Sequence, residues 1–265
     1  MALMVAVVMS AKPDKNFHIY LCFGQSNMEG NARIEEVDRQ GVDPRFVMMA
    51  AAEGKERHLG QWYPAIPPLC RENNGLTPVD YFGRTLVENL PQKVRVGVIN
   101  VAVGGCKIEA FMQEKIEDYA KTAPIWMKGM LEAYNNDPYQ RLLDMARLAQ
   151  KEGVIKGILL HQGESNTGEK DWPEKVKIVY ERLLKDLGLK AKKCPLLVGE
   201  VVNADTGGVC ASMNEIIQTV PQTIPTAHVI SSAGCPDGPD NLHFNAEGYR
   251  MLGKRYAEAM LKVLK

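Results

Sequence analysis

The stretch "YLCFGQSNMEG", residues 20–30, ends a long apolar run on a serine. The run from Phe17 to Phe23 is nearly continuous, which is typical of a β-strand buried on both faces. A glycine, a glutamine and then Ser26 follow at once. Parallel sheets place their functional sites in the loops at the carboxyl ends of strands. Ser26 is therefore a candidate functional residue, although a serine in this position can also be a simple turn or helix cap.

Similar apolar, β-branched runs recur along the chain, and helix-like segments fill most of the gaps between them. Apolar residues repeat with helical spacing over 174–187 and 246–264. This alternation predicts an α/β fold: a three-layer α/β/α sandwich around a central, mostly parallel, five-stranded sheet. Residues 27–75 are rich in glycine and proline and poorly periodic, so we expect long loops with a short helix there. The five predicted strands are 17–23, 94–102, 154–160, 195–201 and 226–232.

The composition of the chain argues against several classes of protein. The 265 residues include 32 Lys and Arg and 32 Asp and Glu, a balance that argues against a nucleic-acid partner. The longest apolar runs fall short of the roughly 20 residues of a transmembrane helix, so we expect no membrane partner. The six cysteines show no metal-ligand spacing, and no metal is predicted. The sequence does not decide the oligomeric state.

The chain contains no linker, low-complexity run or internal repeat, so we expect one domain over residues 17–265. Residues 1–16 form a separate N-terminal segment in this division. Its apolar part, 2–11, ends in small residues as the second half of a secretory signal does, but no positive charge precedes it. A signal remnant and a cloning remnant are both open interpretations.

Three further predicted strand ends carry polar or glycine-rich segments. Gly104 and Gly105 follow the second strand, and paired glycines can present backbone N–H groups to an anion. The segment "HQGESN", residues 161–166, follows the third strand. Asp240 and His243 lie three residues apart before the last helix. At that spacing a turn can bring the carboxylate to one imidazole nitrogen and leave the other free as a base.

These segments resemble, in chain order, the sequence blocks of the SGNH hydrolase superfamily. More narrowly, they are similar to the sialate O-acetylesterase-like branch, which includes the acetylxylan esterases of carbohydrate esterase family 6. The resemblance spans residues 24–244 and implies the same SGNH, flavodoxin-like sandwich. The four matching blocks are "GQSNM" at 24–28, "GGCKI" at 104–108, "HQGES" at 161–165 and "DNLHF" at 240–244.

The resemblance implies a serine esterase that needs no metal or organic cofactor. Ser26 would be the nucleophile and His243 the general base. The carboxylate that supports His243 is left open between Asp240 and Glu164. The other implied roles are an oxyanion hole formed by the N–H of Ser26, the N–H of Gly105 (Gly104 as second choice) and the side chain of Gln162, and substrate binding by Gln25, Asn27 and His161.

The expected reaction is removal of O-acetyl groups from a carbohydrate through an acyl-serine. The resemblance implies acetylated xylan or a related plant polysaccharide or oligosaccharide first, and O-acetylated sialic acids second. A short-chain lipase or thioesterase of the same superfamily stays open, whereas a non-catalytic carbohydrate-binding domain would not need a nucleophile and a base. A polymeric substrate favours a secreted or periplasmic enzyme. Four aromatic residues are equally well interpreted as sugar-stacking or as packing side chains: Trp62, Tyr63, Trp126 and Trp172.

Overall fold

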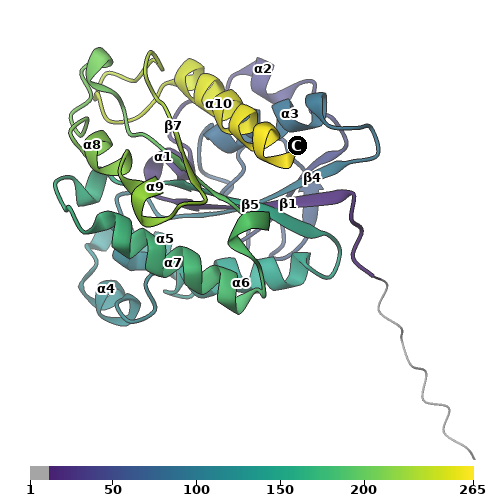
Figure 1. The fold of residues 1–265 in the computed structure, drawn as a ribbon, viewed down its shortest axis with the longest axis horizontal. Coiled ribbons are helices and arrows are strands. Elements are labelled where there is room, and N and C mark those ends of the chain that lie inside the picture. Colours follow the sequence, from purple (N-terminus) through teal and green to yellow (C-terminus); the bar gives the residue numbers. More distant parts are fainter. Residues whose placement is uncertain (1–11) are drawn as a thin grey trace, which may run out of the picture.

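The computed structural model describes residues 12–265, and Figure 1 shows a central sheet between layers of helices. The strands are β1 (Phe17–Gly24), β2 (Phe46–Met49), β3 (Trp62–Pro64), β4 (Arg95–Ala102), β5 (Val154–His161), β6 (Leu196–Gly199) and β7 (Ala227–Ile230). They lie in the order β3-β2-β4-β1-β5-β6-β7. All neighbours pair in parallel except β3, which is antiparallel to β2. The predicted α/β/α sandwich is confirmed.

The predicted number of strands is wrong, because the sheet formed by the described residues has seven strands rather than five. The two additional strands, β2 and β3, lie within residues 27–75, which we expected to form loops. They contain only four and three residues, "FVMM" and "WYP". Runs this short show no periodicity, and their strand conformation depends on pairing with β4 and with each other.

Helices cover both faces of the sheet. In Figure 1, α3 and α10 lie on one side and α4 to α7 lie on the other. The helical segments predicted at 174–187 and 246–264 correspond to α7 and α10. The helices are α1 (Ser26–Glu29), α2 (Glu36–Arg39), α3 (Pro78–Asn89), α4 (Ile116–Thr122), α5 (Ile125–Glu132), α6 (Pro138–Ala149), α7 (Trp172–Asp186), α8 (Met213–Ile217), α9 (Val220–Thr223) and α10 (Ala246–Leu264), with 3-10 turns at Ile108–Phe111, Glu164–Asn166, Ala191–Lys193 and Ala204–Thr206.

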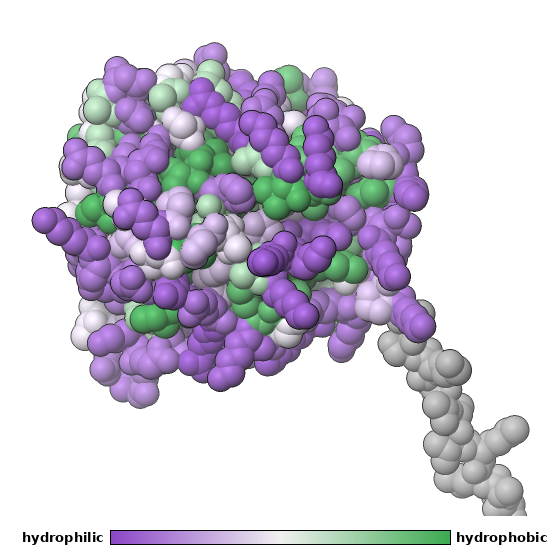
Figure 2. Space-filling view, in the orientation of Figure 1, coloured by the Kyte–Doolittle hydropathy of each residue, from purple (hydrophilic) through white to green (hydrophobic). Residues whose placement is uncertain are grey.

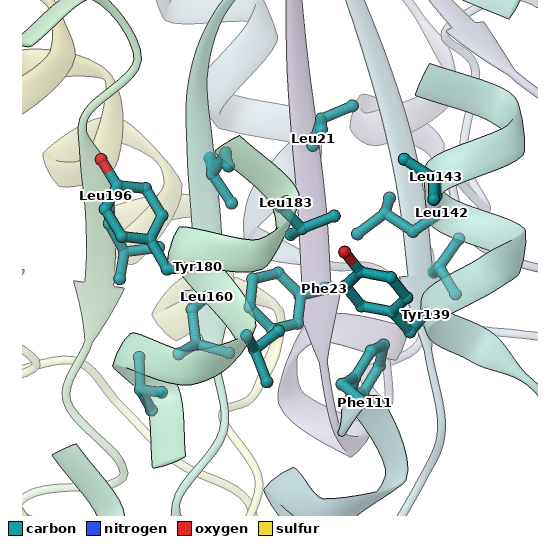
Figure 3. Close-up of a cluster of buried hydrophobic side chains, with 14 of the residues drawn as sticks. Leu21, Phe23, Phe111, Tyr139, Leu142, Leu143, Leu160, Tyr180, Leu183 and Leu196 are labelled. Atoms are coloured by element: carbon teal, nitrogen blue, oxygen red, sulfur yellow. The ribbon is translucent and has the colours of Figure 1, made fainter. Parts of the chain in front are cut away.

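Strand β1 is mostly apolar because both of its faces are covered. Leu21 and Phe23 belong to the core beneath α6 and α7, where Figure 3 shows them among Tyr139, Leu142 and Leu183. Tyr20 and Cys22 point to the opposite face and pack in the core beneath α3 and α10. Each large apolar side chain buried in this way contributes about 1.5–3 kcal/mol.

The three central strands end level with one another, which places the functional loops side by side. Gly24 at the end of β1 pairs with Ala102 of β4 and with His161 of β5. A Cβ atom at Gly24 would overlap the carbonyl oxygen of His161, so only glycine allows this close pairing. The segments that begin at Gln25, Val103 and Gln162 therefore leave the sheet at one edge.

The N-terminal stretch 2–11, interpreted as signal-like, lies outside the described residues, so secretion stays a prediction. None of the helices in residues 12–265 has the length and apolar character needed to span a membrane. Figure 2 shows mostly hydrophilic side chains on the visible face, with hydrophobic residues in separate small groups.

Candidate active site

Ser26, His243 and Asp240 form a continuous hydrogen-bonded chain. Ser26 is the first residue of α1, and His243 lies in the turn before α10. The Oγ of Ser26 lies 2.9 Å from Nε2 of His243. The Nδ1 of the same ring lies 2.6 Å from Oδ2 of Asp240. Serine, imidazole and carboxylate in this order can transfer a proton from the hydroxyl to Nε2.

The turn around Asp240 keeps its carboxylate ionised. Its Oδ1 accepts hydrogen bonds from the backbone N–H groups of Leu242 and His243, both at 3.0 Å. Partial burial alone would raise the pKa of Asp240, but the hydrogen bonds from His243 and Leu242 outweigh it and lower the pKa to about 2. An ionised carboxylate only accepts hydrogen bonds, so the proton of His243 belongs on Nδ1. Nε2 is then free to accept the proton of Ser26.

Glu164, the other predicted carboxylate partner, does not contact the ring of His243. Its Oε1 accepts a hydrogen bond of 2.6 Å from Nδ2 of Asn27, and its Oε2 has no partner among residues 12–265. Burial raises the pKa of Glu164, although the Asn27 bond opposes the rise. Of the two candidates, the structure brings Asp240 to His243.

The side chain of Asn27 clamps the backbone on both sides of His243. Its Nδ2 donates to the carbonyl of Leu242 at 3.0 Å, and its Oδ1 accepts from the N–H of Phe244 at 3.2 Å. The hydroxyl of Tyr249 donates to the same Oδ1 at 2.7 Å. Asn27 is completely buried and follows Ser26 directly. It therefore fixes the position of His243 relative to Ser26 and does not face solvent, where a substrate would bind.

Gln162, predicted as a side-chain oxyanion donor, is buried with its amide already bonded. Its Nε2 lies 2.7 Å from Oδ1 of Asn166, 3.0 Å from Oε1 of Gln25 and 3.2 Å from the carbonyl of Cys106. Its Oε1 accepts from Nε1 of Trp172 at 2.5 Å, which fixes the orientation of the amide. The N–H groups of Gln162 therefore point into the protein.

Gln25 and His161 are also buried, beneath Ser26 rather than in the open part of the site. The Oε1 of Gln25 accepts from the backbone N–H groups of Gly163 and Ser165, both at 3.3 Å. The Nδ1 of His161 lies 3.3 Å from the hydroxyl of Tyr256, and burial lowers the pKa of His161 to about 3. With Asn27, these are the three residues predicted to bind substrate, and all three are buried and contact protein groups.

Two backbone N–H groups remain open at the site. Within residues 12–265, the N–H groups of Ser26 and Gly105 have no protein acceptor, and both residues are partly exposed. Gly105 has a φ of 68°, a left-handed conformation that favours glycine. Its carbonyl is held by the hydroxyl of Ser165 at 2.9 Å. Gly104, the second choice for this role, is buried.

The sequence did not predict that two further residues, Asn166 and Trp172, hold the buried amide of Gln162. Asn166 bonds to Gln162 and to the backbone N–H of Ile108 at 2.9 Å. Trp172 is fully buried against the amide of Gln162. The only signal for Asn166 was its place in the polar segment 161–166. For Trp172, one of the four aromatic residues interpreted as sugar-stacking or packing, the structure shows packing and a bond to Gln162 that the sequence does not predict.

A surface cleft of about 350 Å³ lies beside the Asp240–His243 pair. Its lining includes Asn31, Arg33, Gly238 and Phe244. A larger cleft of about 580 Å³ is lined by Tyr63 but by none of the predicted catalytic or oxyanion-hole residues, so size alone does not identify the site. No group of three His, Cys, Asp or Glu side chains in the described part of the chain is arranged to hold a metal ion.

Comparison with known structures identifies proteins that share this fold. A protein from Arabidopsis thaliana aligns with 94% of this chain and 99% of its own, with a TM-score of 0.70 and 19% identity. A carbohydrate acetylesterase from Xanthomonas citri aligns over 92% of this chain and 56% of its own, with a TM-score of 0.65 and 21% identity. NanS aligns with 95% of this chain and 98% of its own, with a TM-score of 0.65 and 16% identity. At these identities the likeness shows the fold alone.

The sequence family is shown by a separate match over nearly the whole chain. Residues 16–262 match the model of the family described as "Carbohydrate esterase, sialic acid-specific acetylesterase". This confirms the resemblance to the sialate O-acetylesterase-like branch. The chain belongs to this family and is a carbohydrate acetylesterase, a carboxylic ester hydrolase that acts on an acetylated carbohydrate.

Proposed function

We propose that Ser26 is the nucleophile of this esterase, His243 its general base and Asp240 the carboxylate that supports the base. The observation that carries the proposal is the hydrogen-bonded chain, with 2.9 Å from Oγ to Nε2 and 2.6 Å from Nδ1 to Oδ2. Serine, histidine and aspartate act together in this order because each group holds the next in its reactive state.

The reaction proceeds in two halves. As Oγ of Ser26 attacks the acetyl carbonyl, its proton moves to Nε2 of His243, and Asp240 stabilises the imidazolium. Collapse of the tetrahedral intermediate breaks the bond from the acetyl carbon to the sugar oxygen, which leaves as a hydroxyl with the proton from His243. Water then attacks the acetyl-serine, with His243 again as base, and acetate and free Ser26 result.

The oxyanion hole is formed by the N–H groups of Ser26 and Gly105. Both lie at the carboxyl ends of neighbouring strands and have no protein acceptor among the described residues. One such donor contributes roughly 3–4 kcal/mol to the transition state in comparable sites. Gln162 supports the hole from below through the carbonyl of Cys106, at 3.2 Å, rather than donating to the oxyanion itself.

Gln25, Asn27 and His161 have a positioning role in this proposal instead of a substrate-binding one. Asn27 bonds to the turn that carries His243, and Gln25 bonds to the backbone that follows β5. His161 contacts the hydroxyl of Tyr256 in α10. Buried and bonded amides of this kind are rigid, because each lost hydrogen bond would leave an unpaired polar group in the interior.

Acetylated plant polysaccharide, such as acetylxylan, is our first candidate substrate, because the four sequence blocks resemble those of acetylxylan esterases. O-acetylated sialic acids are the second candidate, supported by the family match and by Arg33. Arg33 is exposed, lines the cleft beside His243 and has no ion pair within residues 12–265. Its guanidinium could bind the carboxylate that sialic acids carry and neutral xylan units lack.

The proposal is tested with wild type and Ser26→Ala on 4-nitrophenyl acetate and 4-nitrophenyl octanoate. Acetate release from acetylated xylan and from O-acetylated N-acetylneuraminic acid is measured in parallel. We expect turnover of acetate esters, and Ser26→Ala should reduce kcat by about 10⁵–10⁶ because the nucleophile is lost.

The two natural substrates decide the finer assignment. Faster release from xylan supports the first candidate, and faster release from the sialic acid supports the second. Preference for octanoate would indicate a lipase instead, and turnover that persists in Ser26→Ala would contradict the proposed nucleophile.

A further inference from the structure

Trp126 is the one tryptophan of the three in the sequence whose ring is largely exposed. It has 59% of its surface accessible, although Met127 and Leu131 of the same helix α5 are buried and hold the helix in place. Trp172 is buried. Trp62 packs edge-on against Phe17, with 4.9 Å between ring centroids.

The ring of Trp126 lies directly against Gly105, the proposed oxyanion donor. A Cβ atom on Gly105 would come within 2.6 Å of Cη2 and 3.1 Å of Cζ3 of the indole. Met130, one turn later in α5, lies in the same way against Gly104, with its Sδ 3.3 Å from the Cβ position. Helix α5 therefore packs along the Gly104–Gly105 turn, and the outer edge of the indole borders the site.

The indole has unused binding capacity. Its N–H has no hydrogen-bond acceptor among residues 12–265, and more than half of the residue's surface is open to solvent. A flat apolar face with a polar N–H at its edge matches the face of a pyranose ring, which presents C–H groups in the middle and hydroxyls around the rim. An exposed aromatic ring beside a reaction centre is typical of a ligand contact.

We propose that Trp126 is the platform on which a sugar ring of the substrate stacks, so that the acetyl ester of that ring, or of the adjacent one, is directed to Ser26. The inference rests on the proposed function, since it uses Gly105 as oxyanion donor. It commits to a saccharide as occupant, because the family acts on carbohydrates and the contact adjoins the acetyl-binding groups. Binding energy from the sugar would then orient the ester for attack.

The test compares Trp126→Ala, Trp126→Phe and Ile125→Ala. Ile125 is the matched control, because it is an apolar neighbour in α5 with 85% of its surface exposed. The substrates are acetylated xylo-oligosaccharide, O-acetylated N-acetylneuraminic acid and ethyl acetate, the last chosen because it has no ring that could stack. The measured quantity is kcat/KM for each saccharide divided by kcat/KM for ethyl acetate.

We expect Trp126→Ala to lower this ratio about tenfold on the preferred saccharide, mainly through KM, and Trp126→Phe to lower it less. Ile125→Ala should leave the ratio unchanged. An equal loss on saccharide and ethyl acetate would overturn the platform, because it would mean that Trp126 only supports Gly105. An unchanged ratio in Trp126→Ala would overturn it as well.

A binding measurement keeps this inference separate from the proposed mechanism. In Ser26→Ala, acetylated xylotetraose should change the tryptophan fluorescence, and the change should disappear in Ser26→Ala/Trp126→Phe. If the same fluorescence change persists without Trp126, the platform is wrong even where Ser26 proves to be the nucleophile. The mechanism is tested separately with ethyl acetate, which needs no sugar contact. Equal turnover of ethyl acetate by wild type and Ser26→Ala would contradict the mechanism and would say nothing about Trp126.

Discussion

The molecule contains two histidine–carboxylate pairs with the same spacing of three residues, and their surroundings give them opposite properties. In the Asp240–His243 pair, the two side chains are 49% and 21% exposed and the closest N–O distance is 2.6 Å. In the His161–Glu164 pair, they are 0% and 4% exposed and the distance is 3.9 Å. The first pair lies beside Ser26, and the second lies beneath it.

The comparison shows how burial and hydrogen bonds decide whether the carboxylate of such a pair is ionised. Hydrogen bonds from the turn hold the pKa of Asp240 at about 2 despite partial burial, so this carboxylate is ionised at neutral pH. Burial raises the pKa of Glu164 and lowers the pKa of His161 to about 3, so both groups are driven toward their neutral forms. Only the first pair can stabilise an imidazolium during catalysis.

The largest difference between the pairs is expected in the carboxylate variants. Asp240→Asn should lower kcat by about 10³–10⁴, because the imidazolium loses its counter-charge and Nδ1 its acceptor. Glu164→Gln should lower kcat less than about tenfold, because the buried carboxyl does not contact His243. Steady-state kinetics on 4-nitrophenyl acetate measures both, with circular dichroism to verify folding. A larger loss in Glu164→Gln than in Asp240→Asn would reverse the assignment.

The connection between the pairs is Asn27, which bonds to Glu164 and to the backbone on both sides of His243. Asn27→Ala should lower the free energy of unfolding by about 2–4 kcal/mol, because several buried polar groups lose their partner. It should also reduce kcat, since His243 is no longer held against Ser26. Urea denaturation measures the first effect and kinetics the second.

Asn89→Ala is the matched control for Asn27, because Asn89 is an exposed asparagine of α3 whose side chain bonds only to the carbonyl of Thr85. It should change the free energy of unfolding by less than about 0.5 kcal/mol. A similar stability for Asn27→Ala and Asn89→Ala would show that Asn27 does not clamp the site.

The buried pair also predicts a pH dependence of stability, which comes from His161. Its pKa is about 3 in the folded state and 6.5 as an ordinary histidine, so between these values the unfolded chain binds a proton that the folded chain does not. The contribution of His161 is therefore fully present above pH 6.5 and is lost as the pH falls toward 3, by at most about 1.4 kcal/mol per pH unit.

Thermal or urea unfolding at pH 7, 6, 5 and 4 checks this for wild type and His161→Gln. The free energy of unfolding of wild type should decrease relative to the variant as the pH falls. Asp240 affects stability in a lower pH range. Its lowered pKa contributes stability above pH 3.8, and this contribution is lost as the pH falls from about 3.8 toward 2. Parallel pH curves for wild type and His161→Gln would mean that His161 is charged or exposed in the folded protein.

One contact of this site, between Asp240 and His243, could be predicted from the spacing of the residues because it is local. Asp240 and His243 are three residues apart, and the turn that joins them needs only its own backbone N–H groups. The long strand β1 was predicted from its nearly continuous apolar run. The short strands β2 and β3 were not, because four and three residues acquire strand conformation only through pairing with neighbours.

The sequence alone determined the order of the strand ends, the four blocks and their likeness to an acetylesterase branch. Only the tertiary structure shows that Asp240, and not Glu164, contacts His243, that the amides of Asn27 and Gln162 face inward, and that Trp126 lies against Gly105. The physical reason is distance along the chain. Ser26 and His243 meet across 217 positions, and Asn27 and Glu164 across 137. Burial and orientation at such contacts depend on how the whole sheet and its helices pack.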